Sequence, residues 1–216
     1  MSGDLDEAAW KLRLDAGANE LGIDLDQSQL DTLWRYAHML RERNAHVNLT
    51  SIDSPEGILT LHMLDSLSVA KNLGDSRRLI DVGTGGGFPG IPLAVACPER
   101  QFMLIDGTQK KIRFVAEAIE ALDIRNAHAV AARAESYAGE RGFDVVITRA
   151  VGALADMLAQ CERLLAPHGR LLAMKGRVPD DEIRALPRGW SAEVIPLRVP
   201  GLEAERHLVT LSRRSR

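Results

Sequence analysis

The sequence has few cysteines, few aromatic residues and no long apolar run, and each shortage excludes a class of protein. Its 216 residues include only two cysteines, Cys97 and Cys161, which lie far apart and have no histidine or cysteine nearby at metal-ligand spacing. We therefore expect buried thiols, with neither a disulfide nor a bound metal. No apolar stretch reaches the roughly 18 to 20 residues of a membrane span, and the N-terminus lacks the basic-then-apolar order of a signal peptide. These features predict a soluble, cytoplasmic protein that does not contact membranes.

Charge and aromatic content limit how the chain could bind nucleic acid. It carries 30 acidic and 27 basic residues, a net charge of -3, which argues against broad, sequence-independent coating of nucleic acid. A net charge of this size does not exclude a local basic surface. Aromatic residues make up 4% of the chain, so the extensive base stacking of single-strand binders is not expected. Composition alone leaves the partner undecided.

The first 75 residues have the pattern of a helical unit. Helical spacing of apolar residues and capping signals predict three helices, over residues 5–18, 24–44 and 54–74. The third begins with Ser54 as a cap and Pro55 in its first turn. We expect residues 1–75 to form a helical N-terminal cap on a core of residues 76–216, the two together making one compact unit.

From residue 78 onward, short apolar runs alternate with longer helical stretches. Runs that are apolar on both faces predict strands covered by helices on both sides, as in a parallel α/β sheet. The expected strands cover residues 78–82, 101–106, 127–131, 143–149 and 170–175, and the crossover helices cover 88–98, 108–123 and 152–165. Residues 192–199 and 206–214 predict an antiparallel pair. The fold class is therefore α/β, a doubly wound and mostly parallel sheet with an antiparallel C-terminal edge and a helical N-terminal cap.

The stretch DVGTGGGFPG, residues 81–90, directly follows the first strand, at the carboxyl edge where open α/β sheets bind ligands. Starting at Gly85 it satisfies the G-x-G-x-x-G spacing, and Asp106 ends the next strand about 20 residues later, as a ribose-binding acid would. This pattern fits both a nicotinamide dinucleotide and S-adenosylmethionine. Asp81 favours the second, because a carboxylate at the loop's entrance repels a pyrophosphate and stabilises the cationic methionine end of S-adenosylmethionine. An NAD-dependent oxidoreductase stays open as the alternative.

Six separated motifs occur in order along nearly the whole chain. They are NLTSI at 48–52, HMLDSL at 62–67, DVGTGGGFPGIPLA at 81–94, ITRAV at 147–151, MKG at 174–176 and GLEAERHLV at 201–209. Together they resemble the bacterial 16S ribosomal RNA (guanine-N7) methyltransferases, also called glucose-inhibited division protein B. The resemblance implies a Rossmann-like class I S-adenosylmethionine-dependent methyltransferase that modifies one guanine near the decoding region. Its implied partner is 16S ribosomal RNA or the small ribosomal subunit, and we expect a monomer.

The resemblance also implies cofactor contacts, beside Asp81, Gly85 and Asp106 from the loop pattern. These further contacts are Gly83, Phe88, Ala134, Glu135 and Arg149. From the residues alone, Glu135 could equally be a carboxylate at a helix start, favoured by the helix dipole. Arg149 ends a strand at the ligand edge, where it could pair with a ligand carboxylate or an RNA phosphate, or instead with Glu135 or Asp156 on the surface.

Three residues are candidates for building the acceptor side of the site. Guanine N7 has a lone pair and no proton to lose at neutral pH, so its methylation needs no general base. Alignment of the reacting atoms can supply roughly 7 to 11 kcal/mol instead. We therefore assign Asn48, His62 and Asp65 to positioning the base or contacting the guanine edge. His62 and Asp65 share a helix face, so a structural hydrogen-bonded pair is the alternative for them.

Several basic residues compete for contact with RNA. Lys175 is favoured because it ends a strand on the same edge as the glycine loop, and Arg177 follows it. Lys110 opens the helix after the second strand, where a solvated helix face is the alternative. The charged residues 205–207 are expected to form a structural loop network. A cofactor-binding RNA-binding protein without catalysis is a further alternative to the enzyme.

Overall fold

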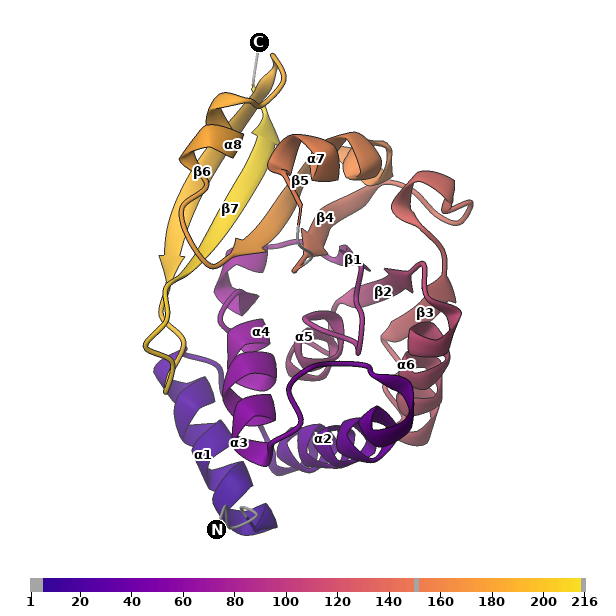
Figure 1. Cartoon of the computed structure of the whole chain (residues 1–216), viewed down its shortest axis with the longest axis vertical. Coiled ribbons are helices and arrows are strands. Elements are labelled where there is room, and N and C mark those ends of the chain that lie inside the picture. The colour runs from indigo at the N-terminus through magenta and orange to yellow at the C-terminus, as the bar shows by residue number, and fades with distance from the viewer. Residues whose placement is uncertain (1–5, 150–151, 215–216) are drawn as a thin grey trace.

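The computed structural model describes residues 6–149 and 152–214, which form one seven-stranded sheet with helices on both faces (Figure 1). The strands are β1 (Arg78–Val82), β2 (Gln101–Asp106), β3 (Ala127–Ala131), β4 (Phe143–Thr148), β5 (Leu165–Lys175), β6 (Trp190–Leu197) and β7 (Arg206–Arg213). The helical elements are α1 (Glu7–Glu20), α2 (Gln27–Val47), α3 (Pro55–Gly57), η1 (Ile58–Leu64), α4 (Asp65–Leu67), η2 (Ala70–Leu73), α5 (Gly90–Ala96), α6 (Gln109–Ala121), η3 (Ala134–Ser136), α7 (Leu154–Cys161), η4 (Glu162–Leu164) and α8 (Asp180–Arg184).

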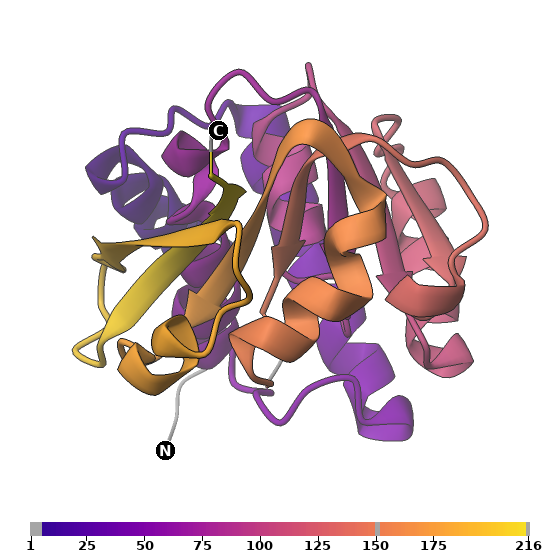
Figure 2. The same cartoon turned by 90° about the horizontal axis from the view of Figure 1, so that it is seen from above.

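The order of strands in the sheet is β3-β2-β1-β4-β5-β7-β6. The first five run parallel, whereas β7 pairs antiparallel with both β5 and β6. Figure 2 shows β6 and β7 at one end of the sheet and β3 at the other. This arrangement confirms the predicted fold class. The carboxyl ends of β1, β2 and β4 consequently lie at one edge, with β1 in the middle.

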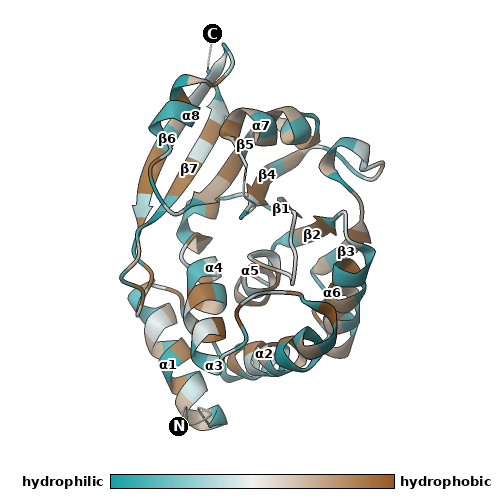
Figure 3. Ribbon diagram, viewed as in Figure 1, coloured by the Kyte–Doolittle hydropathy of each residue, from teal (hydrophilic) through white to brown (hydrophobic). Residues whose placement is uncertain are grey.

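Amphipathic helices cover the two faces of the sheet. In Figure 1, α4, α5 and α6 lie on one face with α1 and α2 beyond them, and α7 lies on the other. The helices carry both apolar and polar segments (Figure 3), and the buried residues of α2 and α6 are mainly apolar. Asp26 caps α2 by accepting from the backbone of Gln29, whose side chain accepts in return from the backbone of Asp26. None of the helices in the described ranges is both long and apolar enough to cross a bilayer.

Two predicted elements differ from the structure. The third helix is not one continuous α-helix, because the π-helix η1 lies between the short helices α3 and α4, and the 3-10 turn η2 follows. Spacing of apolar residues does not reveal the wider turn of a π-helix. Strand β5 begins at Leu165, earlier than the predicted start at residue 170. Its register with β4 shifts between Phe143 and Val145, and the helix predicted over 152–165 is α7 followed by the 3-10 turn η4, which ends at Leu164.

The N-terminal helices and the sheet share one apolar core. A single buried cluster contains Trp10 and Leu33 from the helices together with Leu79 and Phe102 from the sheet. Tyr36 of α2 is fully buried and donates its hydroxyl hydrogen to the backbone carbonyl of Gly86 in the glycine loop. The cap therefore helps to hold the loop in its conformation. The division into a cap of residues 1–75 and a core of residues 76–216, together one compact unit, stays a prediction.

Candidate functional site

The glycine loop turns back over the ends of β1 and β2. Gly83 and Thr84 both donate their backbone N–H groups to the carbonyl of Ile105, over 2.9 and 3.1 Å. Gly87 has a φ of +89°, and a Cβ atom there would lie 2.8 Å from Cγ1 of Ile91 and against the Tyr36 hydroxyl. Only glycine adopts this conformation at such close approach without strain. The loop is consequently held by backbone hydrogen bonds to Ile105 and by close packing of Gly87 against Tyr36 and Ile91.

Asp81 lies beneath the loop and is fully buried, and the cavities described below do not include it in their lining. Its Oδ2 accepts from the hydroxyl of Thr84 over 2.6 Å and from the backbone of Gly90 over 2.8 Å. Its Oδ1 is buried and has no partner among the described residues. Burial raises the pKa of Asp81 to about 6, against the opposing effect of these hydrogen bonds. That Asp81 balances the charge of a methionine end stays a prediction.

A first cavity of about 570 Å³ opens beside the loop, and its lining includes Gly83, Asp106, Ala134 and Glu135. Asp106 joins two segments of this lining, because its Oδ2 accepts from the backbone of Gly85 over 3.0 Å and its Oδ1 from that of Thr108 over 2.7 Å. The structure thus brings four of the predicted cofactor residues together around one cavity, at the predicted edge of the sheet.

A second cavity of about 720 Å³ adjoins the first, and among the described residues only Gly152 lines both. Three cationic side chains line it, those of Arg149, Lys175 and Arg206, together with two anionic ones, Asp65 and Glu182. The lining therefore carries one more positive than negative charge, beside a histidine, His62.

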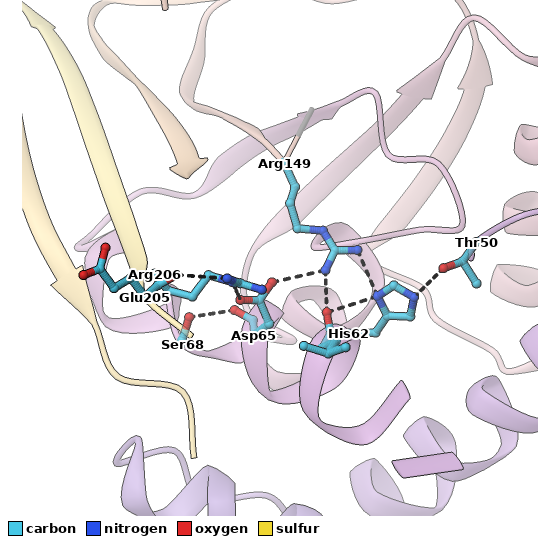
Figure 4. A network of polar contacts seen from close by, with 8 residues as sticks. Thr50, His62, Asp65, Ser68, Arg149, Glu205 and Arg206 are labelled. Carbon is cyan, nitrogen blue, oxygen red and sulfur yellow. Dashed lines mark hydrogen bonds and ion pairs between the residues drawn. The ribbon is translucent and has the colours of Figure 1, made fainter. Parts of the chain in front are cut away.

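Arg149 extends from the end of β4 into the second cavity and meets the helices of the cap (Figure 4). Its Nη1 donates to the backbone carbonyl of Leu61 over 2.8 Å and to Oδ2 of Asp65 over 3.2 Å. The other carboxylate oxygen of Asp65 accepts from Nε of Arg206 over 3.0 Å. Asp65 is 3% exposed, and both of its oxygens are engaged, so it holds the site together and is not free for a guanine edge.

His62 is 4% exposed and contacts Arg149 from the π-helix η1. Its Nδ1 lies 3.1 Å from Nη2 of Arg149, and its Nε2 lies 2.8 Å from Oγ1 of Thr50. Burial, and secondarily the charge of Arg149, lower the pKa of His62 to about 3. His62 is thus neutral near pH 7.

Lys175 lines the second cavity, but its ammonium group is already engaged. It donates to Oε2 of Glu182 over 2.9 Å and to the carbonyl of Gly152 over 2.5 Å. The same Oε2 of Glu182 accepts from the backbone of Leu154 over 2.8 Å, at the start of α7. Lys175 and Glu182 consequently hold residues 152–154, which lie between the two cavities.

The remaining predicted residues lie elsewhere. Phe88 is buried beneath His62 and Arg149 rather than in the first cavity. Asn48 ends α2 in the left-handed conformation and lines a separate hollow that meets the second cavity at Thr50 and Ser51. Lys110 and Arg177 are exposed and line neither cavity.

Sequence reasoning missed two contributors and misjudged the partner of a third. Glu182 lies on a helix of five residues that no pattern predicted. Thr50 carries no signal beyond its place in the motif at 48–52. Arg149 pairs with Asp65 rather than with Glu135 or Asp156. The charged residues 205–207 do join a network, as expected, since Arg206 reaches Asp65. Residues 150–151 of the ITRAV motif lie outside the described ranges.

Residues 29–209 match the model of the GidB family, described as rRNA small subunit methyltransferase G. The ribosomal RNA small subunit methyltransferase G of Methylococcus capsulatus is 46% identical over 198 residues, which cover 92% of this chain and 96% of that one. The protein of the same description from Nitrosococcus oceani is 45% identical, with 92% of each chain covered.

Solved structures share the fold at low sequence identity. The O-methyltransferase TomG from Streptomyces achromogenes, solved in complex with S-adenosylmethionine, superposes with a TM-score of 0.58 at 16% identity, covering 97% of this chain and 99% of its own. TrmN from Thermus thermophilus gives a TM-score of 0.55 at 20% identity, covering 72% of this chain and 53% of its own.

Proposed function

Because the chain belongs to the GidB family of rRNA small subunit methyltransferases G, we propose that it transfers a methyl group to N7 of a guanine in 16S ribosomal RNA. Family membership makes the chain an S-adenosylmethionine-dependent methyltransferase, so the oxidoreductase alternative is wrong. The nucleotide and the atom that receives the methyl group are parts of the proposal.

The first cavity fits the cofactor. Asp106 has a carboxylate at the end of β2, held by the backbone of Gly85 and Thr108, where it can accept from ribose hydroxyls. Ala134 and Glu135 line the same cavity after β3 and would hold the adenine end of the cofactor. The buried Oδ1 of Asp81 has no partner among the described residues, and its charge, from beneath the loop, would favour the cationic methionine end of the cofactor. When bound, S-adenosylmethionine supplies the electrophilic methyl group.

The single observation that carries the choice of N7 is that the described residues around the second cavity offer no free base. Among the described residues that line it, the titratable acceptors are His62, Asp65 and Glu182. His62 is in polar contact through both ring nitrogens, Asp65 is bound by two guanidinium groups, and Glu182 is bound by an ammonium group and a backbone N–H. Methylation of a hydroxyl or an exocyclic amine requires a proton acceptor. Guanine N7 presents a lone pair, and no proton leaves when it takes a methyl group.

The charge of the second cavity supports an RNA substrate. Its excess of cations suits a nucleotide phosphate, and Gly152, which has no side chain, is its shared boundary with the cofactor cavity. Lys175 lines this cavity, Arg177 is exposed two residues further along the chain, and Lys110 is exposed at the start of α6; we assign all three to RNA contact. We assign His62 and Asp65 to the base-binding side, with Asn48 at its margin, and Arg149, which lines the second cavity beside them, to the cofactor.

The test is transfer of labelled methyl from S-adenosylmethionine to small-subunit RNA taken from cells that lack this protein. The expected result is label on one guanine, with cleavage at that position after reduction and aniline treatment, as 7-methylguanine gives. Label on a different atom or base would overturn the choice of N7. Cofactor uptake without labelled RNA, in naked or subunit form, would favour a binding protein without catalysis.

A further inference from the structure

His62 has more polar contacts than a buried packing residue needs, yet the proposed reaction requires no base. Its ring nitrogen Nε2 lies 2.8 Å from Oγ1 of Thr50. Its Nδ1 lies 3.1 Å from two groups, the carbonyl oxygen of Leu61 and Nη2 of Arg149. The position of the ring proton decides which of these contacts are hydrogen bonds.

Arg149 determines that position. A guanidinium group has N–H donors and no acceptor, so a nitrogen that bonds to it must present a lone pair. Nδ1 of His62 is therefore unprotonated, and the ring hydrogen lies on Nε2, from which it is donated to Thr50. The carbonyl of Leu61 accepts from Nη1 of Arg149 instead, over 2.8 Å. The backbone N–H of Ile52 also donates to Oγ1 of Thr50, over 3.1 Å, which agrees with the hydroxyl oxygen acting as acceptor.

These bonds leave one edge of the guanidinium group open. Nη1 of Arg149 is used by Leu61 and Asp65, and one hydrogen of Nη2 is used by His62. The Nε–H and the second Nη2 hydrogen have no partner within residues 6–149 and 152–214. These two N–H groups of Arg149 are parallel and form the side-on edge of the guanidinium group. An edge of this kind binds a carboxylate through two parallel hydrogen bonds.

We propose that His62 is a positioning residue, which as the neutral Nε2–H tautomer holds Arg149 through its Nδ1 lone pair and leaves the side-on edge for the carboxylate of S-adenosylmethionine. This rests on the proposed function, because it takes Arg149 as a cofactor contact. A protonated ring would turn an N–H group toward Nη2 and break the arrangement.

The surroundings of His62 keep it in this form. The ring stacks on Phe88 of the glycine loop, with centroids 4.3 Å apart. The charged groups of this network come from three elements, Arg149 at the end of β4, Asp65 on α4 and Arg206 on β7, and the two cations are shared by the single carboxylate. Burial and the charge of Arg149 lower the pKa of His62 to about 3, so the ring keeps a lone pair across the physiological range.

Two substitutions separate the lone pair from the ring. His62→Asn places an amide oxygen where Nδ1 was and loses the stacked ring, whereas His62→Phe keeps the ring and loses the acceptor. We expect His62→Phe to weaken S-adenosylmethionine binding about tenfold or more by calorimetry. We expect His62→Asn to recover most of that loss. Equal affinities for His62→Phe and the unaltered protein, or an Asn variant as weak as the Phe variant, would overturn the proposal.

A spectroscopic measurement on the unaltered protein keeps the test independent of folding of the variants. Long-range proton–nitrogen correlation of labelled histidines should show His62 with hydrogen on Nε2 only, unchanged between about pH 5 and pH 8. Hydrogen on Nδ1, or titration of this ring within that range, would refute the assignment. Arg149→Ala tests the cofactor role of Arg149 separately from the positioning role of His62. Unaltered S-adenosylmethionine affinity in that variant would overturn the cofactor role of Arg149 and, with it, the proposed use of its side-on edge. The tautomer would then still be reported by the spectrum.

Discussion

The ring of His62 lies flat on the ring of Phe88, with centroids 4.3 Å apart and planes inclined by 13°. One residue belongs to the N-terminal helices and the other to the glycine loop, so the contact joins the proposed acceptor side of the site to the proposed cofactor side. The guanidinium carbon of Arg149 lies 5.3 Å from the centroid of the Phe88 ring. A change on either side of this stack is therefore transmitted to the same arginine.

The buried Asp81 predicts how cofactor affinity depends on pH. Burial raises its pKa to about 6, so lowering the pH through that value removes its negative charge. If the charge stabilises the cationic methionine end, S-adenosylmethionine binds more weakly as the pH falls from 7.5 to 5, by up to about tenfold per unit below the pKa. The isosteric Asp81→Asn variant should bind weakly throughout and show a flatter profile. Calorimetry over this pH range measures the affinity of both proteins. Parallel profiles of affinity against pH would show that Asp81 does not contribute to cofactor binding.

Asp106 should matter more for the cofactor than another carboxylate of the same cavity. Asp106→Ala removes the acceptor for ribose and the bonds to Gly85 and Thr108, so we expect about 10- to 100-fold weaker binding, as loss of a charged hydrogen bond costs. Asp156→Ala is the matched control, because Asp156 lines the cavity from α7 and is exposed. Comparable losses in the two variants would contradict the role given to Asp106.

Gly87 and Gly189 separate backbone strain from crowding. Both have φ near +90°, but a Cβ at Gly87 would press on Tyr36 and Ile91, whereas none of the described atoms lies within 4 Å of one at Gly189. Each alanine substitution pays for the strained conformation. Gly87→Ala should lose about 1 to 3 kcal/mol more in free energy of unfolding, because it also overpacks the core. Urea denaturation of the two variants measures this difference, and equal losses would show that the loop adjusts freely.

Lys175 is expected to serve RNA although Glu182 holds it in the free protein. Lys175→Ala should weaken RNA binding and reduce its salt slope by about one phosphate contact, with cofactor affinity retained. Glu182→Gln should act in the opposite direction, because the amide keeps an acceptor for Leu154 and releases the ammonium group. Filter binding at several salt concentrations measures both slopes. An unchanged salt dependence of RNA binding in Lys175→Ala would show that Lys175 does not contact RNA and only holds residues 152–154.

The neutral His62 predicts lost stability in acid. Its pKa is about 3 in the folded protein and near 6.5 in the unfolded chain, so between these values only the unfolded chain takes up the proton. The stability that His62 contributes is therefore present above pH 6.5 and is lost as the pH falls toward 3, by up to about 1.4 kcal/mol per unit. His62→Asn should reduce this acid sensitivity in urea denaturation between pH 7 and pH 4. An identical pH dependence in the two proteins would show that folding does not lower the pKa of His62.

The sheet could be predicted because its signals are local. Each parallel strand is a short apolar run, and the glycine loop needs no information beyond its own spacing and the position of Asp106. The five parallel strands, the antiparallel end and the edge that bears the cavities all follow from these patterns. Capping residues such as Ser54 located the helix starts for the same reason.

The acceptor side of the site could not be predicted in the same way. Asp65 meets Arg149 across 84 residues and Arg206 across 141, and no periodicity encodes such distant pairs. Glu182 lies on a short helix whose sequence is typical of an exposed loop. The burial of Asp81 could not be predicted either, because the sequence motif does not tell whether this carboxylate faces the ligand or the protein core.

The ion pair between Asp65 and Arg206 ties the assembly of this site to strand β7. Asp65 is synthesised first, and its second partner follows 141 residues later, at the start of β7. A growing chain can therefore complete its glycine loop long before the acceptor side has all its charges in place. The second cavity gains its full set of charges only after β7 has been synthesised, so truncations that remove β7 should yield a protein without a working site, however well the earlier strands fold.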